Sequence, residues 1–252
     1  TDLLKLSPEQ RTLLEKTYRK FVRNGANLKD ENKLKYREIT RSLSELSLQF
    51  DENVLAETNS FYLHLTSKDE LAGLPQGLVE AAASEAKQKN LEGWVITLHI
   101  PMYLPFMKYS ERRDLREKIY KAYNSRAYNN NDFDNTINVT RIANLRLELA
   151  NILGYDNYAL YVLEDRMAES PERVESFLNE LLNASIPYAQ EELKEVQQFA
   201  KEIGADYRIE KWDWAFFTEK LKSKKFNLKE EELKPYFQLE KVKEGIFLLA
   251  NK

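Results

Sequence analysis

The chain of 252 residues contains 42% hydrophobic and 31% charged residues, and 41 acidic against 38 basic side chains give a formal net charge of −3. This near-neutral charge gives no general electrostatic case for nucleic-acid binding. The absence of cysteine excludes disulfides, thiolate metal sites and cysteine nucleophiles. No apolar run approaches the roughly 18 residues of a membrane-spanning helix, and residues 1–5 lack the layout of a signal peptide.

The scarcity of helix-breaking residues indicates the fold class. Seven glycines and seven prolines are about half the usual share of these residues and leave room for few turns. Long helices are therefore favoured over a β-sandwich, a barrel or a repeat-strand protein. We expect a mainly α fold, in which residues 1–252 form one multihelical domain without an internal boundary.

The first elements in chain order are two helices. Ser7 is a plausible N-cap with Pro8 at the first helical position, and Asn24-Gly25 is a good C-terminal signal. Residues 28–58 then contain no glycine or proline, and their apolar side chains recur at steps of three and four. This second stretch predicts a helix of roughly 30 residues, near 45 Å long at about 1.5 Å per residue.

The apolar period changes to two in two short stretches, at about residues 60–66 and 93–100. Alternation of this kind predicts β-strands. We expect the two strands to pair as a small antiparallel ribbon, with a helical insert around residues 77–90 between them. Pro101 and Pro105 should end the second strand because proline cannot continue a ladder.

The rest of the chain again has helical periodicity. Ser170-Pro171 combines an N-cap with a proline at the first helical position, and Pro187 should kink the helix that follows. The predicted helices cover residues 110–126, 134–153, 157–163, 170–203, 213–224 and 239–250.

The catalytic inventory of the sequence is poor. Its two histidines, His64 and His99, do not form His-Glu-x-x-His, although they lie on the same class of face of the two predicted strands. A polar, partly solvated ribbon face is favoured over a metal site, which would lack a third ligand. Phosphate-binding glycine loops and the Gly-x-Ser-x-Gly elbow are also absent from the sequence. We therefore predict no catalytic, cofactor-binding or metal-binding residue within the chain.

Three other clusters have a structural and a functional interpretation. Residues 212–217, Trp-Asp-Trp-Ala-Phe-Phe, could form a stacking wall for a ligand, but a helix start that packs into a core with Asp213 as N-cap is favoured. Residues 129–132, Asn-Asn-Asn-Asp, lack the glycine of a twelve-residue calcium loop and indicate a polar loop. Lys222, Lys224 and Lys225 are offset by residues 230–232, all glutamate, so a solvated helix surface is favoured over an anion site.

Several segments resemble the thimet oligopeptidase family of zinc metallopeptidases. Residues 93–127 are similar to its strand-and-helix segment, and residues 153–174 to its Leu-Gly-Tyr segment and the Met-Ala-x-Ser/Thr-Pro helix start. Residues 212–247 resemble the helix and the Leu-Lys-Pro-Tyr-Phe turn before its catalytic region, and residues 13–28 are also similar. Within the family, the stretches VLEDRMA, WDWAFFTEK and YFQLEKV look most like the bacterial peptidyl-dipeptidase branch, also called dipeptidyl carboxypeptidase.

The resemblance implies a helical ellipsoid split by a deep channel, with zinc on the channel floor. Family members hold the zinc with His-Glu-x-x-His and a later glutamate, all beyond the matched stretches. We therefore expect this chain to be an inactive fragment without bound zinc that forms channel wall. The parent enzyme would use zinc and release dipeptides from the C-termini of short peptides.

Two alternatives stay open: an oligopeptidase of the same family that cleaves internal bonds, and a stand-alone helical module that binds peptides or proteins without catalysis. The expected partners are short peptides, with neither nucleic acid nor membrane. The fragment is also expected to self-associate through its exposed channel or truncation face. A cytoplasmic location is implied by the bacterial branch, or a periplasmic one if a signal peptide precedes the chain.

Overall fold

The computed structural model describes residues 6–227 and 230–251. The chain divides into two compact units: the first contains the chain up to residue 60 with residues 125–186, and the second contains residues 61–124 with the chain from residue 187 onward. We expected one domain without an internal boundary. That expectation, of a single domain over residues 1–252, stays a prediction.

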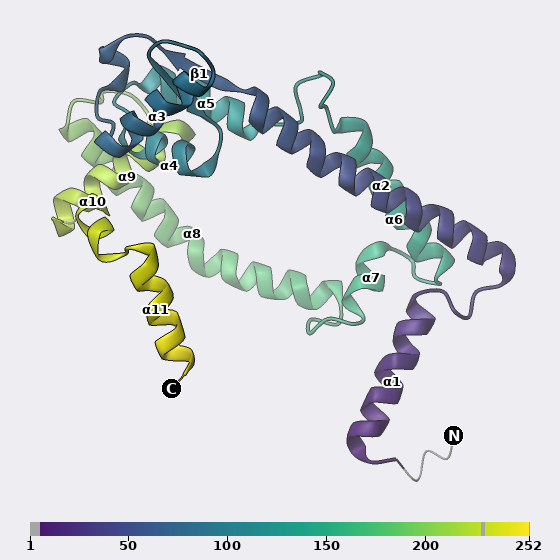
Figure 1. Ribbon diagram of the computed structural model, residues 1–252. Helices are drawn as coiled ribbons and strands as arrows, with labels where there is room; N and C mark the ends of the chain where they lie inside the picture. The colour runs from purple at the N-terminus through teal and green to yellow at the C-terminus, as the bar shows by residue number, and fades with distance from the viewer. Residues whose placement is uncertain (1–5, 228–229, 252) are drawn as a thin grey trace. The chain divides into compact units, whose positions relative to one another are not determined.

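The first unit is made of helices joined by short loops (Figure 1). α1 (Pro8–Arg23) begins at the predicted N-cap, because the Ser7 hydroxyl accepts from the backbone of Gln10 and the Gln10 side chain accepts from the backbone of Ser7. α2 (Asp30–Ser60) is the predicted long helix, and α6 (Thr136–Ile152) packs beside it in the opposite direction. α7 (Tyr158–Leu163) and the first half of α8 (Pro171–Glu202) complete this unit.

A network of asparagine side chains sets the register of α2 against α6. Asn53 donates to the side-chain oxygen of Asn135 at 2.9 Å, and Asn135 donates to the carbonyl of Phe50 at 3.0 Å. Asn138 donates to the same Asn135 oxygen. Asn135 and Asn138 are buried, so these bonds satisfy groups that would otherwise be costly to bury.

The loop at residues 125–135, which leads into α6, is held on α2 by one carboxylate. Glu57 is 8% exposed, and its oxygens accept from the backbone of Ala127 and from the side chains of Asn129 and Asn131. Asn129 donates at 2.6 Å and Asn131 at 2.9 Å. The predicted polar loop at residues 129–132 thus uses its amides to bind a glutamate of the same chain.

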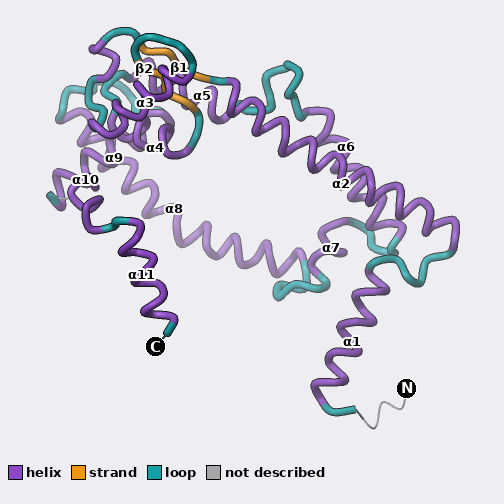
Figure 2. Tube along the Cα trace, in the orientation of Figure 1, coloured by secondary structure: helices purple, strands orange, loops and turns teal. Residues whose placement is uncertain are grey.

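The second unit contains the predicted ribbon, drawn as the two strands in Figure 2. β1 (Tyr62–Leu65) pairs antiparallel with β2 (Trp94–Thr97), with His64 opposite Val95. Between them lie a 3₁₀ turn (Lys68–Leu71) and α3 (Gln76–Gln88). The elements that follow are α4 (Ile100–Tyr109), α5 (Arg113–Asn124), α9 (Lys211–Phe226), α10 (Glu230–Leu233), a second 3₁₀ turn (Lys234–Tyr236) and α11 (Leu239–Ala250).

Two apolar clusters form the core of this unit. In one, α3 and α4 pack on the ribbon, and its buried members include Leu65, Ile96, Phe106 and Ile119. The other joins the end of α8 to α9 and buries Val196, Ala200, Ala205, Ile209, Phe216 and Phe217. The favoured interpretation of residues 212–217, a helix start packed into a core, is confirmed for the two phenylalanines.

The mainly α class and the small antiparallel ribbon are confirmed, but the second strand differs from its prediction. Its end at Thr97 leaves room for α4, which the sequence analysis missed, and Pro101 stands in the first turn of that helix, where it needs no N–H partner. Val95, Ile96 and Thr97 are all buried because α3 and α4 cover β2, so the expected solvated face is wrong for this strand.

Two details of the long C-terminal helices also differ from prediction or extend it. Glu210, not Asp213, is the N-cap of α9; Asp213 is the third residue of the helix and accepts from the Glu210 backbone at 3.0 Å. α8 continues through Pro187, and the boundary between the two units falls directly before this proline. A kink at Pro187 stays a prediction.

Some predictions concern residues that the structure does not describe. Residues 1–5, where we found no signal-peptide layout, are not described, nor are the side chains of residues 230 and 231. Among the described residues, helices both long and apolar enough to cross a lipid bilayer do not occur.

Candidate functional site

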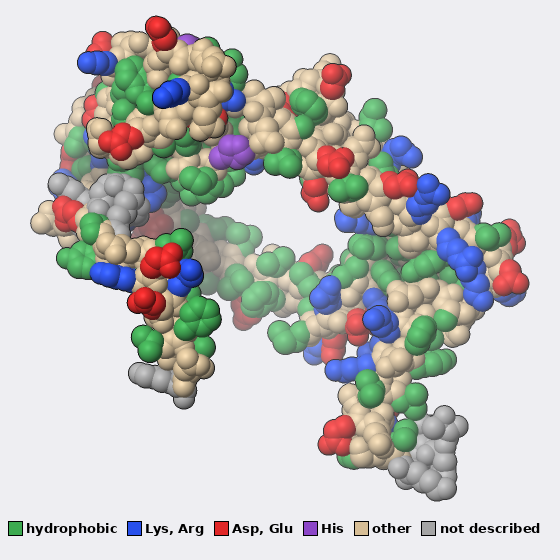
Figure 3. All heavy atoms as spheres, in the orientation of Figure 1, with side chains coloured by type: hydrophobic (Ala, Val, Ile, Leu, Met, Phe, Trp, Pro, Cys, Tyr) green, Lys and Arg blue, Asp and Glu red, His purple; other side chains and the backbone are tan. Residues whose placement is uncertain are grey.

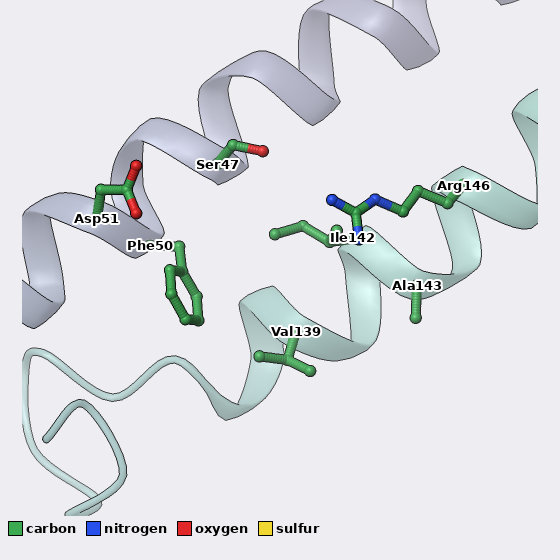
Figure 4. Close-up of a pocket in the computed structure, with 7 residues that line it drawn as sticks. All are labelled: Ser47, Phe50, Asp51, Val139, Ile142, Ala143 and Arg146. Atoms are coloured by element: carbon green, nitrogen blue, oxygen red, sulfur yellow. The ribbon is translucent and has the colours of Figure 1, made fainter. Parts of the chain in front are cut away.

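A groove of about 370 Å³ lies in the first unit between α2 and α6 (Figure 4). Two helix faces form it. α2 contributes Ser47, Phe50 and Asp51, which share one side of the helix because they are three and four residues apart. α6 contributes positions separated by three, four and seven residues, namely Val139, Ile142, Ala143 and Arg146.

The groove has an apolar middle and charged ends. Phe50 and Ile142 point into the space between the helices, and the Arg146 side chain extends back along α6 toward Ile142 (Figure 4). The Asp51 carboxylate lies on the other side of Phe50, on α2. Such a combination of apolar lining with few polar groups is typical of a site for a small organic ligand.

The chain's charged networks elsewhere in the first unit join helices. Arg23 at the end of α1 forms an ion pair with Glu164 and donates to the Tyr161 carbonyl at 2.6 Å, with its guanidinium 4.4 Å from the centre of the Tyr161 ring. The Tyr155 hydroxyl donates to Glu164 at 2.5 Å. These bonds from Tyr155 and Arg23 hold the pKa of the Glu164 carboxyl below its usual value.

The corresponding network of the second unit is buried. Asp213 is fully buried and accepts from Arg116 at 2.7 Å and from Arg113 at 3.0 Å. Arg116 is 1% exposed and also donates to the carbonyls of Ser110 and Trp212. Each of the three guanidinium nitrogens of Arg116 thus donates to a protein acceptor, which makes this a structural network rather than a place for substrate.

The structure does not bring the two histidines into one site. His64 lies opposite Val95 in the ribbon, and its Nε2 donates to the carbonyl of Glu92 at 2.6 Å. His99 lies beyond the end of β2, where it is the N-cap of α4. The pairing register therefore does not make them neighbours across the ribbon.

The predicted lysine surface is confirmed as a paired one, and each lysine has an acidic partner on α8 or α9, while the side chains of residues 230 and 231 lie outside the described part of the chain. Lys222 is paired with Glu219, Lys224 with Glu202, and Lys225 with Glu195. The predicted partners were the glutamates at residues 230–232. The lysines thus bind the chain's own carboxylates rather than forming a cluster of positive charge without counter-ions.

Within residues 6–227 and 230–251, three or more His, Cys, Asp or Glu side chains do not gather as metal ligands would. The described residues therefore do not fit a zinc ion, which needs three or four such ligands in tetrahedral geometry. The α2–α6 groove was missed because its residues come from helices about 90 positions apart in the sequence. The signal that could have found it is an apolar helix face that ends beside a charged residue, Asp51 on α2 and Arg146 on α6.

Residues 106–252, more than half of the chain, match the sequence profile described as Peptidase family M3. The chain belongs to this peptidase family. The match includes the end of α4 and the whole of α5, α9 and α11, so it contains the buried Asp213 network, and it also contains α6, one wall of the groove.

Curated relatives extend the similarity over nearly the whole chain. Oligopeptidase A of Escherichia coli K12 is 38% identical over 98% of this chain, and the organellar oligopeptidase A of Arabidopsis thaliana is 38% identical over 99%. The dipeptidyl carboxypeptidase of Escherichia coli K12 is 32% identical over 98% of the chain. The chain spans 37% of the length of each of the two Escherichia coli proteins and 32% of the Arabidopsis one.

Proposed function

We propose that the complete protein is a zinc-dependent peptidase that hydrolyses short peptides, and that this chain supplies helical wall of its substrate channel. The match to Peptidase family M3 over residues 106–252 carries the proposal. The relatives named oligopeptidase A support peptides as the substrate class, because their similarity covers 98% of the chain. Zinc, when bound, would polarise the scissile carbonyl and activate water.

The chain's own part in this function is structural. The described residues do not fit a zinc ion, so no step of hydrolysis is assigned to them. The buried Asp213 network and the Asn135 network hold long helices in fixed register, which is what a rigid channel wall requires. We expect the 252-residue chain by itself to hydrolyse no peptide and to bind no stoichiometric zinc.

We propose internal bonds of short peptides as the preferred point of cleavage. The proteins named oligopeptidase A are 38% identical to this chain, compared with 32% for dipeptidyl carboxypeptidase. Release of C-terminal dipeptides is the second candidate, favoured by the resemblance of VLEDRMA, WDWAFFTEK and YFQLEKV to the peptidyl-dipeptidase branch. The first sequence interpretation, a peptidyl-dipeptidase, therefore stays a prediction beside its alternative.

The products of the complete enzyme distinguish the two activities. A peptide of about ten residues with an amidated C-terminus would be incubated with the purified complete protein and analysed by mass spectrometry. The same peptide with a free C-terminus would be tested in parallel. Internal cleavage gives mixed fragments of the amidated peptide. A peptidyl-dipeptidase requires the free carboxylate and gives successive dipeptides from the unblocked peptide only. Activity should disappear with a chelator and return with zinc.

Failure of the complete protein to hydrolyse either peptide, with zinc present, would contradict the peptidase proposal. Saturable peptide binding without hydrolysis would then favour the stand-alone helical module. The cytoplasmic location stays a prediction, and the relatives include both an organellar oligopeptidase A and a protein named probable cytosolic oligopeptidase A.

A further inference from the structure

The α2–α6 groove carries opposite charges on its two sides that do not neutralise each other. Within the described part of the chain, no cationic group lies within ion-pair distance of Asp51 and no carboxylate lies within that distance of Arg146. Arg146 instead lies over the Tyr158 ring, with the guanidinium carbon 5.3 Å from the ring centre. This contact uses the face of the guanidinium and leaves the N–H groups at its edge for an acceptor.

The helix geometry sets the distance that a ligand would have to bridge. α2 and α6 are antiparallel, and the Asn53–Asn135 and Asn135–Phe50 hydrogen bonds fix their register. By this register Asp51 lies beside the first turn of α6, about nine residues before Arg146. Nine residues correspond to roughly 13 Å along the axis, and the Arg146 side chain extends back over part of this distance. A peptide of two or three residues, extended at about 3.4 Å per residue, spans about 7 to 10 Å.

The middle of the groove suits an apolar side chain. Phe50, Val139, Ile142 and Ala143 line it, and the volume of about 370 Å³ falls within the usual range of small-ligand sites. A ligand with one apolar group and opposite charges at its ends would therefore match both the lining and the charges.

We propose that this groove binds a peptide of two or three residues with both termini free. The ammonium group of the peptide pairs with Asp51, its carboxylate pairs with Arg146, and an apolar side chain lies against Phe50 and Ile142. The proposed site is built only from residues of α2 and α6, so the inference does not depend on which bond the complete enzyme cleaves.

The test uses the complete protein, treated with a chelator so that no peptide is hydrolysed. Phe50 is replaced by 4-fluorophenylalanine through site-specific incorporation, and the fluorine resonance is followed by NMR during titration with the dipeptide Leu-Phe. We expect a saturable shift of this resonance. N-acetyl-Leu-Phe and Leu-Phe-amide, which each lack one terminal charge, should each raise the Kd about fivefold.

Substitutions with matched controls assign the two charges. Arg146→Gln should weaken Leu-Phe about fivefold and abolish the difference between Leu-Phe and its amide, whereas Arg141→Gln on the same helix should change neither. Asp51→Asn should also weaken Leu-Phe about fivefold and should abolish the difference between Leu-Phe and N-acetyl-Leu-Phe. Glu52→Gln is the control on α2 and should change neither. All four side chains are exposed, so these variants should keep the helical circular dichroism of the parent.

A fluorine resonance that does not move with millimolar Leu-Phe would overturn the proposal. This is the result expected if another part of the protein or a second copy covers the groove. Equal binding of the free and blocked peptides would overturn the assignment of the charges. Neither outcome depends on hydrolysis, so failure here is distinguishable from failure of the peptidase proposal.

Discussion

Asp213 is the residue whose removal tests the physical account of the second unit most directly. Its carboxylate is fully buried and accepts hydrogen bonds from Arg113, from Arg116 and from the backbone of Glu210. Asp213→Ala removes the counter-charge of Arg116, which is 1% exposed and cannot move to water without opening the helices around it. The variant therefore leaves an uncompensated buried cation.

The expected loss of stability follows from this burial. Removal of one partner of a buried ion pair typically costs about 3 to 5 kcal/mol. Arg113 adds little to this cost because its side chain is 36% exposed and water screens its charge. We expect Asp213→Ala to lower the free energy of unfolding by about 4 kcal/mol, close to three powers of ten in the folding equilibrium constant.

Urea unfolding followed by circular dichroism at 222 nm measures this change. The matched control is Asp114→Ala, since Asp114 is 61% exposed and pairs with Arg112 on the surface at 2.8 Å. That variant should lose at most about 1 kcal/mol. Adding Arg116→Met to Asp213→Ala should recover part of the loss, because it removes the unpaired charge. If Asp213→Ala costs no more than the control, the buried network is not what holds α5 to α9.

The remaining predictions concern the first unit and the isolated chain. Glu57→Ala should cost about 1 to 3 kcal/mol and speed proteolysis of the loop at residues 125–135, because three donors lose their acceptor, whereas the exposed Glu52→Ala should do neither. The lowered pKa of Glu164 means that its bonds to Tyr155 and Arg23 stabilise the fold fully above the ordinary value of 4.5 and progressively less as the pH falls through the folded-state pKa. Glu164→Gln should therefore destabilise the chain at pH 7 in thermal melts, and a difference from the parent that persisted unchanged to about pH 2 would contradict this reasoning. The 252-residue chain should self-associate in light scattering as its concentration rises, and a clean monomer at high concentration would count against that expectation.

The helices were predictable because their signals are local. Ser7, Pro8 and Gly25 mark the limits of α1, and the uninterrupted stripe of residues 28–58 corresponds to α2 within two residues at each end. α4 was missed because Pro101 and Pro105 were interpreted as the end of a strand. Pro101 is equally consistent with the first turn of a helix. Only the packing of α4 against the ribbon and α9 decides between a strand end and a helix start.

Side-chain partners were less predictable, because they depend on which helices meet. Aspartate is a residue type that often caps a helix N-terminus, which is why Asp213 was predicted as an N-cap. Its observed partners are instead Arg113 and Arg116, about 100 residues earlier in the chain. The same holds for the three lysines of α9, which have acidic partners on α8 and on α9 itself that the local sequence did not indicate. Local sequence predicted that these charges would be compensated and could not predict by which residue.

Apolar side chains of α8 are exposed over much of its length, so the described contacts leave this helix without a packed apolar face. Every residue of α8 from 175 to 195 is exposed, including Phe177, Leu178, Leu181 and Leu182, and Figure 3 shows further apolar side chains at the surface of α1 and α11. A helix in water gains most of its stability from packing of its apolar face, and α8 has little such packing over these 21 residues. Its stripe therefore requires a cover. We expect the remainder of the proposed peptidase to cover it in the complete protein and a second copy to cover it in the isolated chain, so self-association should weaken when the complete protein is made.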